Sequence, residues 1–316
     1  MYVRLRNAAA VVALLVGLAG AMPVHAQVLP TLRIATIPLE NSAQVFYAKD
    51  LGLFAKAGLN VELQSMQSGS AVAAAVTSNA VDIGFASLVP LAVAHTKNIP
   101  FVIIAPGVLW TDAGRNNGLY VPAGSSIHSG SDLNGKILGT AGLGTLTEFA
   151  ARAWVQQHGG DASTIKFVEI PYSTMPAALA AGRIDAALVN EPYLGAVRKG
   201  NRLLGYPYDA VAKEFLIAAW FSTAQWAKDH PDAVARFAKV MRETAMWANK
   251  KENQAKSAEI LAKYTKIDPT QLAGVVRVRF TDQLNAALIQ PQIDIAAEYA
   301  RFPTFPAQDI MVASPR

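Results

Sequence analysis

One short unit occurs twice in this chain. Residues 73–90 read AAAVTSNAVDIGFASLVP, and residues 177–193 read AALAAGRIDAALVNEPY. Both contain an alanine-rich run, a turn residue, a β-branched residue before an aspartate, an apolar run and a proline: Asn79, Val81, Asp82 and Pro90 in the first, and Gly182, Ile184, Asp185 and Pro192 in the second. The pattern predicts a helix followed by a buried strand. Its repetition about a hundred residues later predicts two similar lobes.

The sequence around both copies alternates between short β-like runs and longer helix-like runs. One alternating series covers residues 31–109, and a second begins after the polar, Gly-rich passage at 111–118 and runs to 207. Such alternation predicts an α/β fold in which each lobe is a mainly parallel sheet flanked by helices. The second copy is therefore expected to be the second helix and third strand of its own lobe.

The last hundred residues follow a different pattern. An apolar run at 215–223 is able to carry the chain back to the first lobe, and helices are expected at 231–251, 253–265, 269–280 and 291–302. The simplest topology has lobe one formed by 27–117 plus 221–316, with lobe two inserted as 118–220. Two crossing strands would then form the hinge.

The first 26 residues have the features of a secretory signal peptide. Arg4 and Arg6 precede the apolar stretch 8–22, and Val24-His25-Ala26 provides the small-x-small cleavage pattern. A membrane anchor is the alternative, but the stretch is shorter than the ~20 apolar residues that a spanning helix needs. We expect cleavage after Ala26. The chain has no cysteine, so neither a lipid anchor nor a disulfide is expected in the exported, soluble protein.

The charge balance indicates no nucleic-acid partner. The formal net charge is +5, and without Arg4 and Arg6 there remain 26 basic and 23 acidic residues, a formal +3. Basic residues do not cluster, so this charge bears on solubility and weak attraction of anions. The five histidines are scattered without metal-ligand spacing, and no G-x-S-x-G motif occurs. We therefore predict no metal, no cofactor and no catalytic residues.

A dinucleotide fingerprint is the sharpest competing motif. Gly142-x-Gly144-x-x-Thr147 follows an expected strand and opens an expected helix, and Glu169 ends the next strand. The third position is Thr instead of Gly or Ala, and Glu169 lies 27 residues after Gly142, farther than the ~20 of the fingerprint. The spacing Thr145 to Glu148 also fits a capping box, which would occupy the Thr145 hydroxyl within the helix.

Polar residues gather where the expected strands give way to helices. Carboxyl ends of parallel strands share one sheet edge, so these residues should face a common cleft. The serines are equally well explained as ordinary helix caps, and Glu191 as a solvated or Arg-paired surface acid. The candidates are Asn41, Ser42, Ser68, Gly69 and Ser87 in lobe one, and Gly144, Thr145, Thr147, Tyr172, Asn190 and Glu191 in lobe two. Asp82 and Asp185 begin their strands at the opposite edge, so we interpret them as turn caps.

Two tryptophans are candidates for aromatic walls of the cleft. Trp110 ends the last strand of the first series, and Trp220 lies on the expected returning strand. An aromatic floor would suit a ligand with a flat or apolar part. Trp154, Trp226 and Trp247 fall on helical faces and are expected in the core.

Several phrases taken together resemble a known family. GLFAKAGLNVELQ at 52–64, SDLNGKILGTAGLGT at 131–145 and ALAAGRIDAALVNEPY at 178–193, with the signal peptide, are similar to periplasmic substrate-binding proteins of ATP-binding cassette importers. The branch is the one that includes nitrate, taurine, alkanesulfonate and pyrimidine-precursor binders. The resemblance implies a two-lobed, type II-like periplasmic binding protein, a monomer without enzymatic activity that closes on a small molecule and delivers it to a membrane permease.

Two other functions remain open on the sequence alone: an exported enzyme that uses the same cleft, and a sensory binding protein that serves a receptor. The enzymes related to the pyrimidine-precursor binders resemble chains rich in cysteine and histidine. The absence of cysteine here argues against that enzyme branch. Ligand identity is open as well. Helix N-termini favour a small anion, whereas Glu191 and the aromatic residues favour a cationic or heterocyclic group.

Overall fold

The computed structural model describes residues 31–272 and 275–312. The predicted signal peptide and its cleavage point lie outside the described residues. Within the described ranges, no helix combines the length and the apolar character that a membrane span requires.

The first sheet has the order β11-β4-β10-β3-β1-β2. Strands β1, β2 and β3 pair in parallel, whereas β10 lies antiparallel between β3 and β4, and β11 pairs antiparallel with β4. The bounds are β1 Thr31–Thr36, β2 Asn60–Ser65, β3 Ile83–Ala86, β4 Phe101–Trp110, β10 Phe215–Thr223 and β11 Arg279–Phe280. The sheet is therefore mixed, because the returning strand β10 enters it in the opposite direction.

The second sheet has the order β7-β6-β8-β5-β9. Strands β6, β7 and β8 pair in parallel, and β5 lies antiparallel between β8 and β9. The bounds are β5 Asn117–Pro122, β6 Ile137–Thr140, β7 Lys166–Glu169, β8 Ala186–Asn190 and β9 Asn201–Gly205. Each sheet thus receives one antiparallel strand at the point where the chain crosses from the other.

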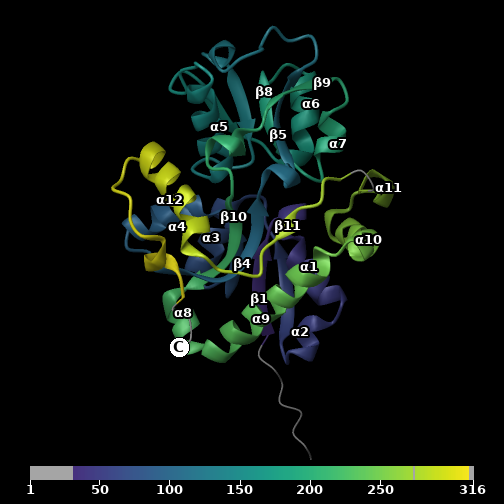
Figure 1. Ribbon diagram of the computed structural model, residues 1–316, viewed down its shortest axis with the longest axis vertical. Coiled ribbons are helices and arrows are strands. Elements are labelled where there is room, and N and C mark those ends of the chain that lie inside the picture. The colour runs from purple at the N-terminus through teal and green to yellow at the C-terminus, as the bar shows by residue number, and fades with distance from the viewer. Residues whose placement is uncertain (1–30, 273–274, 313–316) are drawn as a thin grey trace, which may run out of the picture.

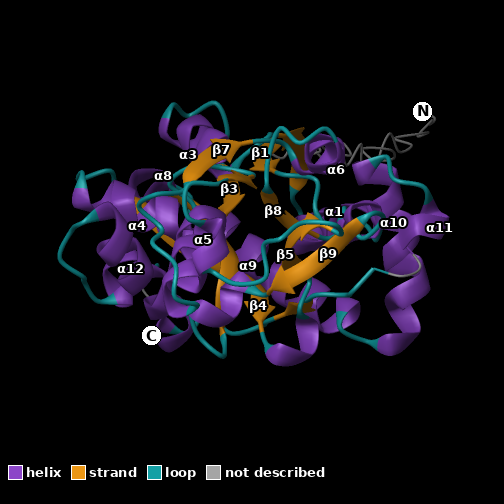
Figure 2. Ribbon diagram, turned by 90° about the horizontal axis from the view of Figure 1, so that it is seen from above, coloured by secondary structure: helices purple, strands orange, loops and turns teal. Residues whose placement is uncertain are grey.

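Helices cover both sheets (Figures 1 and 2). In both views α4 and α12 lie on one side of the first sheet and α1 and α10 on the other. Helices of the first lobe are α1 Ala43–Asp50, α2 Leu53–Lys56, α3 Gly69–Thr77, α4 Leu88–Thr96, α8 Ala224–Asp229, α9 Pro231–Ala248, α10 Gln254–Thr265, α11 Pro269–Leu272 and α12 Ala286–Ala300. Those of the second are α5 Leu146–Gln157, α6 Met175–Ala180 and α7 Leu194–Val197. The α/β class and the two-lobed architecture are confirmed.

The duplicated stretch has the same local structure in both lobes. It forms α3 and β3 in the first and α6 and β8 in the second. Asp82 exchanges two hydrogen bonds with Arg33 on β1: its N–H donates to the Arg33 carbonyl at 2.9 Å, and its carboxylate accepts the Arg33 N–H at 2.8 Å. Asp185 exchanges the same two bonds with Ile137 on β6, both at 2.8 Å. Both aspartates are therefore structural, although they join neighbouring strands instead of capping their own turns.

The chain passes between the two sheets at two places in the middle of its sequence. The 3₁₀ turn η2, Asp112–Gly114, connects β4 to β5, and η5, Pro207–Ala210, connects β9 to β10. Figure 1 shows both crossings between the upper and lower halves of the molecule. The predicted boundary at 117/118 falls at the first residue of β5, and the one at 220/221 falls inside β10. The division into domains at these residues stays a prediction.

The C-terminal region departs from the expected helices in two segments. Of the described residues in 269–280, those of α11 are helical and the last two form the short strand β11. The alternation of Val276, Arg277, Val278 and Arg279 is a two-residue period that favours extended chain. Helix α12 begins at Ala286, five residues before the expected start, and contains Pro291 in its interior.

Buried side chains join the helices of the first lobe to its central strand. Trp220 on β10 is fully buried, and its indole N–H donates to Gln44 Oε1 of α1 at 2.9 Å. The Gln44 amide in turn donates to the Met241 carbonyl of α9 at 2.6 Å. This polar link inside an apolar core fixes the position of α1, which follows directly on the candidate site residues Asn41 and Ser42.

Candidate functional site

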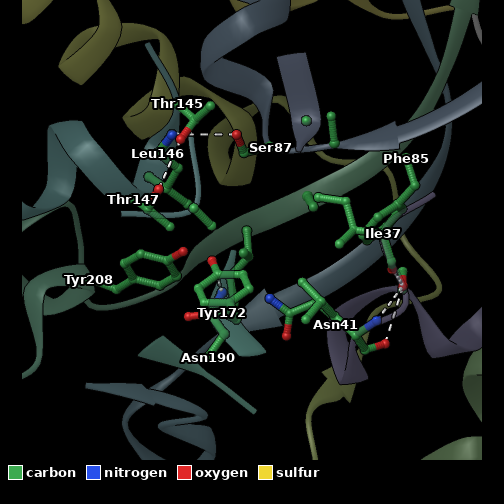
Figure 3. A pocket seen from close by; sticks show the side chains of 17 residues that line it. Ile37, Asn41, Phe85, Ser87, Thr145, Leu146, Thr147, Tyr172, Asn190 and Tyr208 are labelled. Carbon is green, nitrogen blue, oxygen red and sulfur yellow. Dashed lines mark hydrogen bonds between the residues drawn. The ribbon is translucent and has the colours of Figure 1, made fainter. Parts of the chain in front are cut away.

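A cavity lies between the two sheets, at the carboxyl ends of their parallel strands (Figure 3). Its volume is about 70 Å³. Both lobes supply its walls: Ile37, Leu39, Asn41, Ser42, Gly69, Phe85, Ala86, Ser87, Ile217 and Ala218 from the first sheet and its connections, and Ala141, Thr145, Leu146, Thr147, Tyr172, Asn190 and Tyr208 from the second sheet and its connections. This is the location that open α/β sheets favour for a ligand.

The wall from lobe one is built by the connections that follow β1 and β3. The chain leaves β1 at Thr36 and turns through the 3₁₀ helix η1, Glu40–Ser42, where the Ser42 hydroxyl donates to the Ile37 carbonyl. Ser87 follows β3 and is the N-cap of α4 by its extended backbone. The Ser87 side chain makes no cap bond to α4, and the first helix N–H, on Leu88, donates to Gln292 Oε1 of α12 at 2.9 Å.

The wall from lobe two begins with the loop between β6 and α5. Thr145 is the N-cap of α5, but its hydroxyl donates to the Gly142 carbonyl at 2.8 Å and lies 2.9 Å from the Thr147 hydroxyl. The Glu148 carboxylate accepts the N–H of Gly144 at 2.7 Å, not that of Thr145. The expected capping box is therefore wrong, because the glycine in the left-handed conformation (φ 66°) turns its own N–H toward Glu148.

Tyr172, Asn190 and Tyr208 form a polar cluster on the same wall. The Asn190 amide donates to the Tyr172 hydroxyl at 3.0 Å. Burial raises the pKa of Tyr172 and of Tyr208 well above the usual range of a phenol, so both hydroxyls remain protonated. Asn190 Oδ1 is buried without a hydrogen-bond partner. Such an atom carries a desolvation cost unless a ligand or water supplies a donor.

Direct hydrogen bonds cross the cavity between the lobes. The Leu146 N–H at the start of α5 donates to Ser87 Oγ at 3.4 Å, which Figure 3 shows as a dashed line. The Asn116 amide, on the crossing before β5, donates to Asn41 Oδ1. Farther out, the Tyr299 hydroxyl of α12 donates to Gln156 Oε1 of α5. The two walls are thus in contact around the cavity.

Eight of the predicted site residues line this cavity: Asn41, Ser42, Gly69, Ser87, Thr145, Thr147, Tyr172 and Asn190. Two more lie next to lining residues without lining it themselves. Ser68 caps α3 by accepting the Ala71 N–H at 3.3 Å, and Gly144 precedes Thr145. The role of each residue in binding stays a prediction.

Trp110, Trp220 and Glu191 do not line the cavity. Trp110 is buried against Tyr208 and Phe215, and Trp220 packs in the core between Phe85 and Phe237. Neither indole forms the expected aromatic floor. That role falls instead to Phe85, Tyr172 and Tyr208, of which the sequence indicated only Tyr172.

Glu191 is buried beside the C-terminal segment of lobe one. Its carboxylate accepts the Val276 N–H at 3.2 Å, and the Arg198 guanidinium lies 3.8 Å away. Burial raises the pKa of Glu191, while the Val276 N–H opposes the increase. The side chain therefore connects the two lobes outside the cavity, which differs from the ligand-selecting role we expected.

A second buried carboxylate lies near this connection. Glu40 Oε1 is 3.2 Å from Arg277 Nε, and burial raises the pKa of Glu40 to about 7 in spite of that cation. Arg277 also donates to the Tyr47 hydroxyl at 2.6 Å and to Ser257 Oγ at 2.7 Å. The guanidinium thus has neutral partners as well as a charged one.

The acid of the dinucleotide fingerprint, Glu169 at the end of β7, contacts the glycine-rich loop between β6 and α5. Glu169 accepts the Leu143 N–H at 3.3 Å. It therefore contacts the glycine-rich turn directly instead of lying at a distance where a ribose would separate the two. Among the described residues, no group of three or more His, Asp and Glu is arranged to hold a metal ion.

The remaining lining residues were missed for an identifiable reason. Ile37 and Leu39 follow the carboxyl end of β1, where the rule for open sheets would have indicated them. Ile217, Ala218 and Tyr208 lie on the returning crossing, and no local sequence pattern shows that this segment passes under the cavity. They reach it because β10 is inserted between β3 and β4.

The fold and the interlobe cavity define a two-lobed binding protein, and comparisons with known proteins agree. The periplasmic aliphatic sulphonate binding protein of Escherichia coli aligns with a TM-score of 0.73 at 17% identity, over 90% of this chain and 93% of its own. The same fold also occurs in a desulfurization enzyme, with a TM-score of 0.65 at 16% identity over 88% and 95% of the two chains. These likenesses establish the periplasmic binding protein fold.

Sequence comparison then places the chain in a family. The model of the NMT1-like family matches residues 26–262, so the chain belongs to that family. Among curated proteins, the taurine-binding periplasmic protein of Escherichia coli (strain K12) is 25% identical over 244 residues, which cover 71% of this chain and 72% of the relative.

Proposed function

We propose that this protein is the solute-binding component of an ATP-binding cassette importer, and that it captures a small molecule in the interlobe cavity and delivers it to a membrane permease. The observation that carries the proposal is the cavity itself, which combines residues of both lobes at the carboxyl ends of their strands. Similarity to taurine- and sulphonate-binding periplasmic proteins supports the transport role and a periplasmic location.

Hinge closure is the mechanism that this arrangement favours. The two crossings through η2 and η5 would act as the hinge, and the Ser87 to Leu146 hydrogen bond belongs to the closed form. A ligand that contacts both walls stabilises that form, because it binds the closed state better than the open one. The permease would recognise the closed conformation, in which both lobes present their surfaces together.

A ligand screen by thermal shift tests the proposal, since a solute that binds only the folded protein raises its melting temperature. We expect Tyr172→Ala and Asn190→Ala to weaken binding of the identified solute by about tenfold or more, roughly 1.4 kcal/mol. Trp154→Phe, in the core of lobe two, is the matched control and should keep the affinity. Equal affinity of all three variants and the wild type would place the site elsewhere.

Two further measurements separate the alternatives. Recovery of the bound solute unchanged after prolonged incubation argues against an exported enzyme, and a converted product would establish one. Loss of solute uptake in a cell lacking this protein distinguishes transport from sensing. The N-terminal residue of protein released from the periplasm tests the expected cleavage after Ala26.

A further inference from the structure

We propose that the cavity selects an uncharged ligand with an amide-type polar group over sulfonate and carboxylate anions. The inference rests on the proposed function, since it concerns what the same interlobe cavity holds. It departs from the names of the similar proteins, which bind taurine and sulphonates.

The cavity presents no charged side chain. Its described lining residues include no Asp, Glu, Lys, Arg or His, and the polar ones are hydroxyls and amides. An anion that leaves water for an apolar site loses its hydration, and without a cation in the wall only hydrogen bonds replace it. A neutral polar group has much less hydration to lose.

Helix N-termini are the other source of anion affinity, but one N–H group at the start of each helix here already has a side-chain partner. The three helices that start at the cavity each have an N–H that donates to a side-chain oxygen: Ala71 to Ser68 Oγ at 3.3 Å, Leu88 to Gln292 Oε1 at 2.9 Å, and Leu146 to Ser87 Oγ at 3.4 Å. Fewer donors are therefore left to replace the hydration of an anion.

Two carboxylates from neighbouring elements, Glu148 of α5 and Glu169 of β7, bind the backbone of the loop before α5. Glu148 accepts the Gly144 N–H at 2.7 Å and Glu169 accepts the Leu143 N–H at 3.3 Å. Arg152 pairs with Glu148 at 2.6 Å, so these two charges offset each other and the Glu169 carboxylate is the negative charge that remains beside the loop. A ligand anion at the start of α5 would meet negative charge where the helix dipole normally attracts it.

The polar cluster of Tyr172 and Asn190 matches an amide. Because the Tyr172 hydroxyl accepts from the Asn190 amide, its own hydrogen is free to donate. Asn190 Oδ1 accepts no hydrogen bond. The Tyr208 hydroxyl lies near the Asn190 side chain, which opposes the rise in the Tyr208 pKa caused by burial. No hydrogen bond joins that hydroxyl to Oδ1. A carboxamide or lactam offers an N–H beside a C=O and pairs with Asn190 in either orientation of the side-chain amide.

Matched pairs of probes test the inference on the full-length mature protein. In each pair an NH2 group of an uncharged amide takes the place of one oxygen of the anion: benzamide and benzoate, acetamide and acetate, benzenesulfonamide and benzenesulfonate, methanesulfonamide and methanesulfonate. Affinities are measured by calorimetry at neutral pH. We expect the uncharged member of each binding pair to bind at least about tenfold more tightly, which corresponds to roughly 1.4 kcal/mol.

A charge-removal variant tests the cause. Glu148→Gln with Glu169→Gln keeps acceptors for both loop N–H groups and removes both carboxylates, so anion affinity should rise several-fold relative to amide affinity. The control is Glu243→Gln with Glu259→Gln, which changes the net charge equally on exposed helix faces. A purely structural effect would change both ligand classes by the same factor.

The outcomes separate this inference from the function on which it depends. Tighter binding of the anionic members overturns the inference and leaves the solute-binding function intact, as does an anionic molecule that copurifies with the protein from the periplasm. Tighter binding of the neutral members supports the inference. If no probe binds and no small molecule copurifies, the proposed function fails and the inference fails with it.

Discussion

The pH dependence of stability should reveal the buried carboxyl of Glu40. Its side chain is almost completely buried, and burial raises its pKa from 4.5 to about 7 in the folded protein. Between these two values the folded chain holds a proton that the unfolded chain has released. The free energy of unfolding must therefore fall as the pH rises from 4.5 through 7. The full difference corresponds to roughly 3 kcal/mol at 1.36 kcal/mol per pH unit.

Glu40→Gln removes this titration and keeps the shape of the side chain. Urea unfolding of both proteins at pH values from 4 to 8 gives the difference in their free energies of unfolding. We expect the variant to gain about 2 to 3 kcal/mol relative to the wild type across that range. Arg277 keeps its bonds to Tyr47 and Ser257 in the variant. Glu243→Gln, on an exposed helix face, should follow the wild-type profile.

The opposite sign would refute the reasoning. If the attraction between Glu40 and Arg277 outweighs the cost of burying the carboxylate, ionisation stabilises the folded state. The wild type would then gain stability relative to Glu40→Gln as the pH rises. Glu191 also has a pKa raised by burial, but it is present in both proteins, so its own titration largely cancels in the difference.

Two further predictions concern stability. Gln44→Ala leaves the Trp220 N–H buried without a partner and removes the side-chain bond to the Met241 carbonyl, so it should lower the free energy of unfolding by about 1 to 3 kcal/mol in urea titrations; an unchanged free energy would show that water replaces the side chain. Asp82→Ala and Asp185→Ala should each cost about 1 to 3 kcal/mol through the lost backbone bond. The Asp82 variant should lose up to about 1 kcal/mol more, because only Asp82 also pairs with a guanidinium, that of Arg33 at 2.6 Å, and this excess should shrink in high salt.

Local periodicity was sufficient to predict most of the elements of both lobes. The apolar spacing of the duplicated stretch fits a helix followed by a buried strand. The two aspartates recur at the same structural position because Asp82 joins β3 to β1 and Asp185 joins β8 to β6, the corresponding strands of the two sheets. The segment 276–280 was assigned to a helix although its two-residue alternation favours a strand. The alternation of valine and arginine in this segment therefore indicates extended chain, and the predicted helix is wrong there.

The candidate site was predictable only where strand ends determine it. Asn190 ends β8 and Ser87 follows directly on β3, so topology alone brings them to the cavity. Glu191 is the next residue after Asn190, yet its partner is Val276, 85 residues away. No local signal shows that the C-terminal segment passes this point. Trp220 likewise shares a strand with cavity residues, but its indole bonds to Gln44, 176 residues earlier in the chain.

The position of β10 has a consequence for how the protein is made. This strand fills the gap between β3 and β4, so the first two hundred residues to emerge during synthesis contain a sheet with its centre missing. The first sheet is therefore completed only after Phe215–Thr223 have been synthesised, whereas all strands of the second sheet are present by Gly205.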